Sequence, residues 1–443
     1  MTPDDRTALA AEAFIYGCPL VFDLEQVDRF VRSGMSSVPA TPFNRFGHAT
    51  QLAGPEATFV SINNDTVYSI AQVDLSAGPV RLDVPDTAGR YYVLQFVDAW
   101  TNNFAYVGHR STGTAAASYL LAPPGSQIQP SGDATVIHFP TDVGTIVGRW
   151  AVNGEGDLPV VRALQAGLTL TPTVASPANG LPIPNPAVPE GVRFFEQMRV
   201  WMQAFPPARR DLAYQKRFEV LGLFDIDSPF VDPDPDLLSA LRDGLVQGRE
   251  LMEQALRSNP SPVQNGWMLT YHVFDYNLDF FEVGTVDDDE WKVEDQPRAR
   301  YLLRASAARG GLWGNHGYEA AYAMVYVDSD GHQLNGASRY QLHFGTAPPV
   351  GAFWSVTMYG TPEFFLVANP IGRYSIGDRT PGLRTEDGSL TLFMQKDEPE
   401  SPDERANWLP TPSGDFRPIL RMYEPHESVF DGRYELPPIT RRS

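Results

Sequence analysis

The sequence predicts a mainly β protein with helices, in which two antiparallel β modules are joined by a helical bridge. Residues 57–149 alternate apolar and polar side chains in short runs between turn residues, which is typical of a sandwich or barrel. Residues 192–257 instead space their apolar residues as helices do. A second period-two region runs from Tyr318 to residue 443. At 443 residues the chain exceeds what one hydrophobic core usually supports, so more than one module is expected.

The chain begins with a predicted helix over residues 4–32. Gly17 and Pro19 predict a kink in it. Its apolar stripe consists of Leu9, Ala13, Ile15, Tyr16, Leu20, Val21, Leu24 and Val27. The β region that follows is divided by turn signals at 77–79, 85–89 and 123–125. We therefore expect an N-terminal module, residues 1–170, made of this helix and a β-sandwich.

Prolines dominate the start of the middle third. Six of them fall between Thr171 and Pro189, which predicts an extended connector without regular strand pairing. Helical patterns follow at 192–204, 211–220 and 234–257. The connector and helical bridge are assigned to residues 171–312 and the C-terminal β-sandwich module to 313–443.

Net charge limits the function classes. A formal charge of -20 repels nucleic-acid phosphates and anionic lipid surfaces, so neither is an expected partner. A small neutral or cationic ligand is more compatible with the negative electrostatic potential of the protein than an anionic partner is. The N-terminus lacks the basic and apolar regions of a secretory signal, and no apolar run approaches the ~20 residues of a membrane span. We expect a cytoplasmic protein.

Cofactor and metal motifs are missing from the sequence. The sole cysteine, Cys18, excludes a disulfide framework, and its apolar surroundings predict a packed thiol. There is no phosphate-binding loop, no dinucleotide-binding glycine motif and no Gly-x-Ser-x-Gly elbow. The eight histidines are scattered without metal-ligand spacing. No cofactor and no metal are therefore expected.

The segment Asn63 to Ser69 is the best candidate site, because it sets short polar side chains between two strand-like runs. In a catalytic interpretation Asp65 is the general acid or base, Asn63 and Asn64 donate to a developing oxyanion, and Tyr68 orients the substrate. In the structural interpretation the same residues hold a turn together.

Asp98 is a second candidate carboxylate. Alternation places it on one strand face with Tyr92, Leu94, Phe96 and Trp100, where desolvation would raise its pKa toward a catalytic range. Trp100 would then contact substrate. The alternative is that Asp98 ends the strand and caps the turn at 101–103.

The last third supplies one more carboxylate and several aromatic residues. Glu319 either assists catalysis or forms a structural ion pair with Arg309 or Arg339. Trp354 shares a strand face with Val356 and Met358, which indicates core, whereas Ser355, Thr357 and Tyr359 on the other face could line a cleft. The candidate substrate-binding residues in this region are Tyr322, Trp354, Tyr359 and Trp408, the last in an expected loop.

Several motifs together resemble a known bacterial family. The N-terminal module resembles domain of unknown function twelve-fifty-four through Ala13 to Leu20, Asn63 to Ser69, Val84 to Asp86, Gly89 to Tyr92 and Gly108 to Arg110. The C-terminal module resembles twelve-fourteen through Gly314-Asn315, Glu319 to Tyr322, Phe353 to Thr357, Asp387 to Leu390, Asn407 to Pro410 and Arg421 to Pro425. The resemblance implies two jelly-roll-like sandwiches joined by helices, often in a homo-oligomer, and by analogy the modification of small secondary metabolites.

Three hypotheses follow. The first is a cofactor-independent hydrolase, lyase or isomerase that uses acid–base chemistry on an apolar or polyketide-like metabolite, with Asp65 central and Asp98 or Glu319 assisting. The second is a non-catalytic module that binds a carbohydrate or hydrophobic ligand through exposed aromatic residues. The third is a structural protein that assembles through its sandwiches, in which Asn63 to Ser69 is only a turn.

Overall fold

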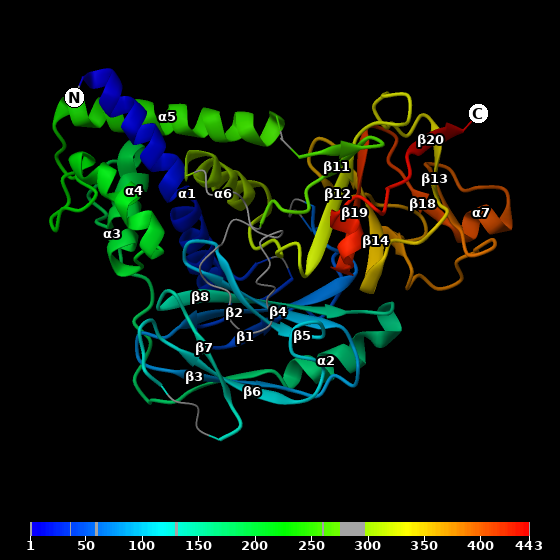
Figure 1. Ribbon diagram of the computed structural model, residues 1–443, viewed down its shortest axis with the longest axis horizontal. Helices are drawn as coiled ribbons and strands as arrows, with labels where there is room; N and C mark the ends of the chain where they lie inside the picture. Colours follow the sequence, from blue (N-terminus) through cyan, green and yellow to red (C-terminus); the bar gives the residue numbers. More distant parts are fainter. Residues whose placement is uncertain are drawn as a thin grey trace.

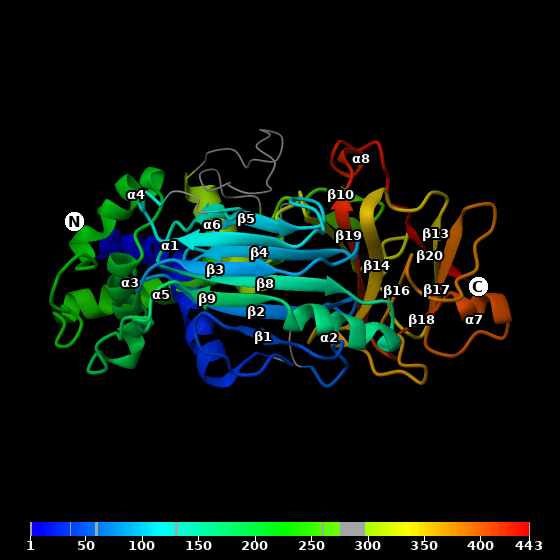
Figure 2. The ribbon, with the colours of Figure 1, turned by 90° about the horizontal axis from the view of Figure 1, so that it is seen from below.

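The structure is a computed structural model that describes residues 2–35, 37–57, 61–128, 132–258, 261–274 and 297–442. Its strands form four mostly antiparallel sheets, two in each β module. Figure 1 shows the N-terminal module below, the C-terminal module at the upper right and the long helices gathered at the upper left. The two β modules lie side by side in both ribbon views (Figure 2).

The N-terminal module is a β-sandwich. One sheet has the strand order β1-β2-β8-β4-β5, formed by Phe46–His48, Thr66–Asp74, Val143–Ala151, Tyr92–Asp98 and Asn103–Gly108. The other has the order β7-β6-β3-β9, formed by Thr135–His138, Ala117–Ala122, Val80–Val84 and Thr169–Pro172. Val67, Leu82, Phe96 and Leu121 from both sheets share one buried core, as alternating strands that bury one face require. Helix α2, Leu158–Ala166, packs Val161 against this core.

The C-terminal module repeats this two-sheet construction. The larger sheet has the order β10-β11-β12-β19-β14-β15, with β16 also paired to β14. Its strands are Val263–Gln264, Trp267–Leu269, Ala320–Val325, Phe416–Pro425, Val350–Gly360, Phe365–Leu366 and Ser375–Gly377. The smaller sheet has the order β18-β17-β13-β20, formed by Trp408–Pro410, Leu390–Gln395, Arg339–Phe344 and Ile439–Arg442. Leu342, Val356, Met394 and Leu420 lie in the core between them.

The helices form a separate layer built around α1, Pro3–Ser33. Thr2 and Asp5 close a capping box at its start, which satisfies two backbone N–H groups of the first turn. The other helices of this layer are α3 (Arg193–Ala204), α4 (Leu212–Lys216), α5 (Pro235–Ser258) and α6 (Pro297–Gly311), with short 3₁₀ turns at Glu190–Val192, Arg209–Asp211 and Arg217–Leu221. Helices α7 (Pro402–Ala406) and α8 (Glu427–Phe430) belong to the C-terminal module (Figure 2), and a 3₁₀ turn at Glu155–Asp157 precedes α2. Apolar residues of α1, α3, α5 and α6 share one core.

Helix α1 is long and apolar enough to meet the length and composition of a membrane span, contrary to the expectation that no apolar run approaches that length. However, 67% of its most apolar window is buried inside the protein. Burial of this kind is what a core helix of the helical layer requires.

The predicted architecture of two β-sandwich modules joined by helices is confirmed. Two local predictions were wrong. Thr171 and Pro172, at the start of the expected unpaired connector, continue β9 and pair with β3. Trp408 to Pro410, expected as a loop, forms β18 and pairs in parallel with β17. In both places a short edge segment pairs with a strand that precedes it in the chain, β3 for β9 and β17 for β18.

Helices α1 and α5 approach closely at two glycines of α5. A Cβ atom added at Gly244 would lie 2.4 Å from the Cβ of Ala10 and 2.8 Å from the carbonyl oxygen of Thr7. At Gly248 an added Cβ would lie 2.9 Å from the carbonyl oxygen of Ala11. The absence of side chains at these two positions therefore sets the distance between the helices.

We expect Gly244→Ala to destabilise the protein by about 1–3 kcal/mol, because the added methyl group overpacks the α1–α5 contact. An alanine inside a helix would otherwise stabilise it by roughly 1 kcal/mol relative to glycine. The measurement is urea denaturation followed by circular dichroism. Gly156→Ala is the control, because nothing lies within 4 Å of the Cβ added there. An unchanged or higher stability for Gly244→Ala would contradict the close contact.

Candidate functional site

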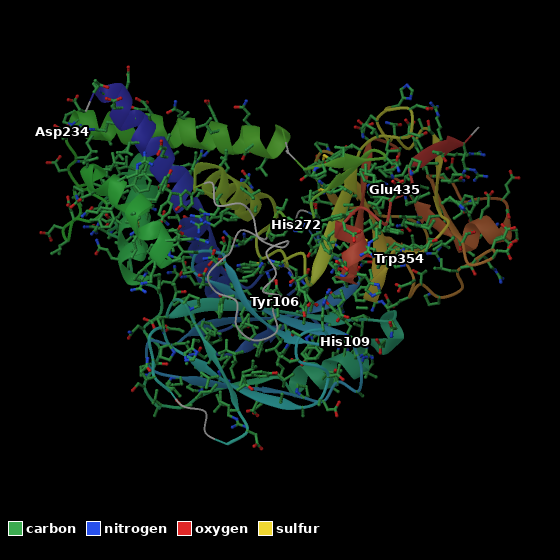
Figure 3. The ribbon with its side chains drawn as sticks, viewed as in Figure 1. Tyr106, His109, Asp234, His272, Trp354 and Glu435 are labelled. Atoms are coloured by element: carbon green, nitrogen blue, oxygen red, sulfur yellow. The ribbon has the colours of Figure 1, made fainter. Side chains whose placement is uncertain are left out.

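Polar side chains gather where the N-terminal five-stranded sheet meets the larger C-terminal sheet. Tyr91, Tyr106, Phe353 and Tyr423 belong to one buried cluster that spans both modules. Figure 3 shows Tyr106 and His109 on the side of the N-terminal module that faces the C-terminal module. We call this polar contact the interface seam and define it by Asn63, Asp65, Tyr68, Tyr91, Arg149, Glu319, Tyr322, Ser355, Arg417, Arg421 and Tyr423.

Asp65 connects the two modules within the seam. The side-chain oxygen of Asn63 accepts a 2.6 Å hydrogen bond from the backbone N–H of Asp65, which is the local turn that an asparagine two residues earlier favours. The carboxylate of Asp65 then accepts from Tyr423 (O to O, 3.0 Å) and from the hydroxyl of Ser355, both in the C-terminal module. The Asn63 to Ser69 segment is therefore both a turn and a contact between modules.

Asn63 uses both of its side-chain N–H groups within the seam. One donates to Thr66 Oγ1 at 3.0 Å and one to the hydroxyl of Tyr423 at 2.6 Å. Asn64 points elsewhere, since its amide donates to the carbonyl of Ala53 and accepts from Ser375 at 3.3 Å. Asn63 therefore orients Tyr423, and Asn64 does not lie beside the Asp65 carboxylate as an oxyanion donor would.

Tyr423 joins Asp65 to the aromatic part of the seam. Burial, followed by the neighbouring Asp65 carboxylate, raises the pKa of Tyr423 well above its usual value. The phenol therefore keeps its proton and acts as a donor. Its ring stacks on Phe353 at 4.2 Å and meets Tyr91 at 5.8 Å between centroids.

Arg149, on β8, is the arginine that the N-terminal module contributes to the seam. Its guanidinium donates to Gln95 Oε1 at 2.7 Å, to Asn315 Oδ1 at 3.1 Å and to the carbonyl of Trp313 at 2.8 Å. It also lies 5.6 Å from the ring centre of Tyr68. Tyr68 and Tyr322 are both partly exposed, so this part of the seam borders the surface.

Glu319 contacts the N-terminal module directly. Tyr91 donates a 2.7 Å hydrogen bond to Glu319 Oε1, while Oε2 is buried without a hydrogen-bond partner among the described residues. Burial raises the pKa of Glu319 to about 8. The expected ion pairs are wrong, because Arg309 pairs with Glu253 at 3.5 Å and Arg339 is an exposed residue of β13, in the smaller sheet of the C-terminal module.

Three residues beside the seam have a strained backbone conformation. Ser61, Trp313 and Glu424 have φ values of 55°, 60° and 53°, a left-handed region that residues with side chains rarely adopt. Each contacts a seam residue or its neighbour: Ser61 with Arg421, Trp313 with Arg149, and Glu424 with Glu319 through a 2.9 Å backbone hydrogen bond. Such strain is found preferentially at functional sites, where the surrounding structure holds it in place.

Asp98 and Trp100 lie outside the seam. Asp98 Oδ1 accepts from the backbone N–H groups of Trp100 at 2.9 Å and Asn102 at 2.8 Å, so the capping interpretation is confirmed. Burial raises the pKa of Asp98 to about 6. Trp100 donates to the carbonyl of Phe205 at 2.8 Å and packs on Tyr16 in the helical layer.

The three remaining aromatic candidates are buried. Trp354 packs against Phe344 inside the C-terminal sandwich, and Trp408 donates to the carbonyl of Gln395 at 2.8 Å. Tyr359 lies near the seam and donates to the carbonyl of Ile62 at 2.6 Å. Sequence reasoning missed Arg149, Arg421 and Tyr423. Alternation along Phe416–Pro425 places Arg421 and Tyr423 on one face and was the signal available.

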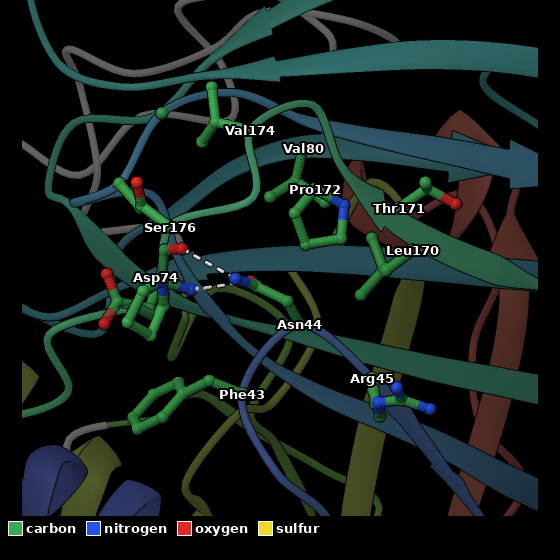
Figure 4. A pocket seen from close by; sticks show the side chains of 14 residues that line it. Phe43, Asn44, Arg45, Asp74, Val80, Leu170, Thr171, Pro172, Val174 and Ser176 are labelled. Atoms are coloured by element: carbon green, nitrogen blue, oxygen red, sulfur yellow. Dashed lines mark hydrogen bonds between the residues drawn. The ribbon is translucent and has the colours of Figure 1, made fainter.

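Two pockets lie away from the seam. The first, about 380 Å³, is lined by Phe43, Val80, Leu170 and Val174 around Asn44, whose side chain is bonded to the backbone of Asp74 (Figure 4). The second, about 350 Å³, is lined by Tyr271, His272, Phe430 and Tyr434 among other residues. No seam residue lines either pocket.

One group of potential metal ligands occurs among the described residues, Asp328, Asp330 and His332, with ligand atoms within 4.8 Å of one another. Asp328 Oδ1 accepts from the backbone N–H groups of Asp330 at 3.0 Å and His332 at 2.9 Å. These bonds cap the connection between β12 and β13. The turn therefore accounts for why these three side chains lie close together.

We expect Glu319→Gln to change how stability depends on pH. Because the folded-state pKa of about 8 lies above the ordinary 4.5, the folded protein keeps a proton that the unfolded chain loses. The free energy of unfolding contributed by Glu319 therefore falls as pH rises from about 4.5 to about 8. The variant lacks this loss, so its stability relative to wild type should rise across that window, on the order of 1.4 kcal/mol per pKa unit.

Thermal denaturation at pH 5, 6.5, 8 and 9 measures this difference. Glu435→Gln, at an exposed position of the same module, is the control for introducing a glutamine. A difference between Glu319→Gln and wild type that stays constant with pH would show that Glu319 is ionised throughout.

Comparison with known proteins agrees with this two-module structure. Residues 43–172 match the family described as "Protein of unknown function (DUF1254)", and residues 319–427 match "Protein of unknown function (DUF1214)". No curated protein matches the chain.

Two solved structures are similar. The VPA0106 protein from Vibrio parahaemolyticus is 23% identical with a TM-score of 0.74, over 99% of this chain and 100% of its own. An uncharacterized protein from Burkholderia cenocepacia is 12% identical with a TM-score of 0.47, over 98% of this chain and 89% of its own. The first shows that the complete fold, including the placement of both modules, occurs in another protein. With both family matches in the expected order, the chain belongs to the tandem DUF1254–DUF1214 family.

Proposed function

We propose that the protein is a cofactor-independent enzyme that modifies a small molecule by acid–base chemistry at the interface seam. The observation that carries this proposal is the hydrogen bond between Asp65 and Tyr423 across the two modules. A buried carboxylate that accepts from a buried phenol can receive a proton through that phenol. The reaction classes consistent with this step are hydrolysis, elimination and isomerisation.

The proposed proton path runs from the substrate to Asp65 through Tyr423. As the Tyr423 oxygen takes a proton from the substrate, its own proton moves to Asp65 Oδ1, and the reverse movement returns a proton to the product. Asn63 holds the phenol in place, so it is a positioning residue. Tyr68 and Tyr322 interact electrostatically with Tyr423 and are partly exposed, which makes them the side from which substrate enters.

The substrate proposed from this lining is a largely apolar or polyketide-like metabolite. Planar groups stack favourably on tyrosine rings. Glu319 is a second proton-exchanging group in the same seam, because its raised pKa of about 8 lies close to neutral pH. The net charge of -20 supports a protein without nucleic-acid or anionic-membrane partners. The jelly-roll connectivity, the homo-oligomer and the role in secondary metabolism are proposed from the family resemblance.

The alternative of aromatic ligand binding loses most of its support. Trp354, Tyr359 and Trp408 are buried, and only Tyr322 of the four proposed aromatic residues is partly exposed. The structural alternative, in which the seam only joins the modules, uses the same hydrogen bonds. Isosteric variants distinguish these roles.

We expect Tyr423→Phe to lower turnover by ~10²-fold or more, because it removes the proton relay and keeps the ring packing. A thermal-shift screen of a metabolite library first identifies ligands of the wild-type protein, and mass spectrometry of the incubated hits then detects products. Tyr340→Phe is the matched control, a buried tyrosine of the same module whose hydroxyl accepts from the backbone N–H of Asn335 at 3.2 Å.

Asp65→Asn should lower turnover to a similar extent, because the amide cannot take the proton. Asp328→Asn, a buried capping aspartate outside the seam, controls for the loss of a buried carboxylate. Full turnover by both Tyr423→Phe and Asp65→Asn would refute the proposed mechanism. Unfolding measured on each variant separates loss of chemistry from loss of structure.

A further inference from the structure

Three arginines of the seam are buried without a carboxylate partner. Arg149, Arg417 and Arg421 are 7%, 6% and 5% exposed. Among the ion pairs of the described residues, within 4.0 Å, none includes any of the three. Their hydrogen-bond partners are neutral amides, hydroxyls and backbone carbonyls.

Other buried arginines of the chain have a direct counter-charge. Arg199 pairs with Glu196 at 2.9 Å, and Arg300 pairs with Asp211 at 2.8 Å. A buried charge without a close partner is costly, because it loses its hydration without gaining an equivalent interaction. The seam therefore differs from the helical layer in holding positive charge that the protein does not neutralise at contact distance.

Two of these arginines belong to β19, four residues apart along the strand. Arg417 and Arg421 lie on the same strand face, and both contact Ser61, the first through its hydroxyl and the second through its carbonyl at 2.8 Å. Both guanidinium groups lie near the ring of Tyr359, at 5.9 and 5.6 Å from its centre. Arg417 Nε is buried and has no hydrogen-bond partner in the described part of the chain. The charge of Arg421 disfavours the charged form of Arg417, and an anion bound near both groups would offset this repulsion.

Arg149 approaches the same region from the N-terminal module. Tyr322 is the cross-strand neighbour of Arg421 and interacts electrostatically with both Arg421 and Arg149. Two carboxylates lie nearby. Asp65 interacts electrostatically with Arg421 but forms no ion pair with it among the described residues, and burial raises the pKa of Glu319 to about 8, so Glu319 is largely protonated at neutral pH.

We propose that the seam binds a small organic anion, whose carboxylate or enolate is held by Arg421 and Arg417 with Arg149 facing it from the other module. Tyr322 and Tyr326, both partly exposed, border the binding position. This inference rests on the proposed function and names the substrate class of that site. It also departs from the neutral or cationic ligand that the net charge of -20 favours, because buried local charge outweighs a screened distant field.

Paired carboxylate and amide probes test this inference. The full-length protein in chloride-free buffer is titrated with benzoate, salicylate, hexanoate and succinate, each beside its neutral amide, and the melting temperature is recorded. At 10 mM, at least one carboxylate should raise the melting temperature by several degrees while its amide does not. A panel in which no carboxylate stabilises more than its amide would overturn the proposal.

Variants locate the binding. Arg421→Gln and Arg417→Gln should each weaken carboxylate binding by at least tenfold in isothermal titration calorimetry. Arg373→Gln is the matched control, because Arg373 is a partly buried arginine of the same module that donates to the carbonyls of Ala406 and Trp408 outside the seam. Undiminished binding in both seam variants would place the anion elsewhere and overturn the assignment.

Asp65→Asn separates this inference from the proposed chemistry. Removing a negative charge from the seam should leave carboxylate binding equal or tighter while turnover is lost. Carboxylate binding without any dependence of turnover on Asp65 or Tyr423 would refute the enzyme mechanism alone. A different outcome would refute this inference alone. In that outcome the protein binds no carboxylate, and it turns over a substrate without an anionic group in a reaction that depends on Asp65.

Discussion

The burial of polar residues between the two β modules is the constraint on which the rest of the structure depends. The carboxylate of Asp65 finds its partners, Ser355 and Tyr423, only in the other module. Glu319 likewise reaches across to Tyr91. Because a buried polar group without a hydrogen bond is costly, neither module can bury its seam face alone. The seam therefore fixes how the modules are placed, and the same contacts assemble the candidate site.

The helical layer also helps to hold the seam in place. Asp23, buried in α1, accepts a 2.7 Å hydrogen bond from the indole of Trp313. The backbone carbonyl of Trp313 in turn accepts from Arg149, and Asn315, two residues later, accepts from the same guanidinium. Helix α1, from the start of the chain, thereby helps to position a loop that follows α6. The helical layer is therefore connected to the seam through Asp23 and Trp313.

The net charge of the chain is negative, whereas the local charge of the seam arginines is positive. The whole chain carries -20, yet the seam holds three buried arginines for which the described residues provide no carboxylate at contact distance. Distant surface charges are screened by water and salt, whereas nearby buried charges act through a medium of lower polarity. The chemistry of a bound molecule is therefore set by the few residues around it.

Local patterns in the sequence determined the β-sandwich modules, the helical segments, the capping role of Asp98 and the turn formed by Asn63 to Ser69. Each of these depends on side-chain alternation or on contacts between residues close along the chain. The pairing of β18, the burial of Trp354 and Trp408, and the partners of Asp65 and Glu319 were decided only by the tertiary structure. Asp65 and Tyr423 are 358 residues apart, so no local pattern relates them. Only the packing of one module on the other brings this carboxylate and this phenol together.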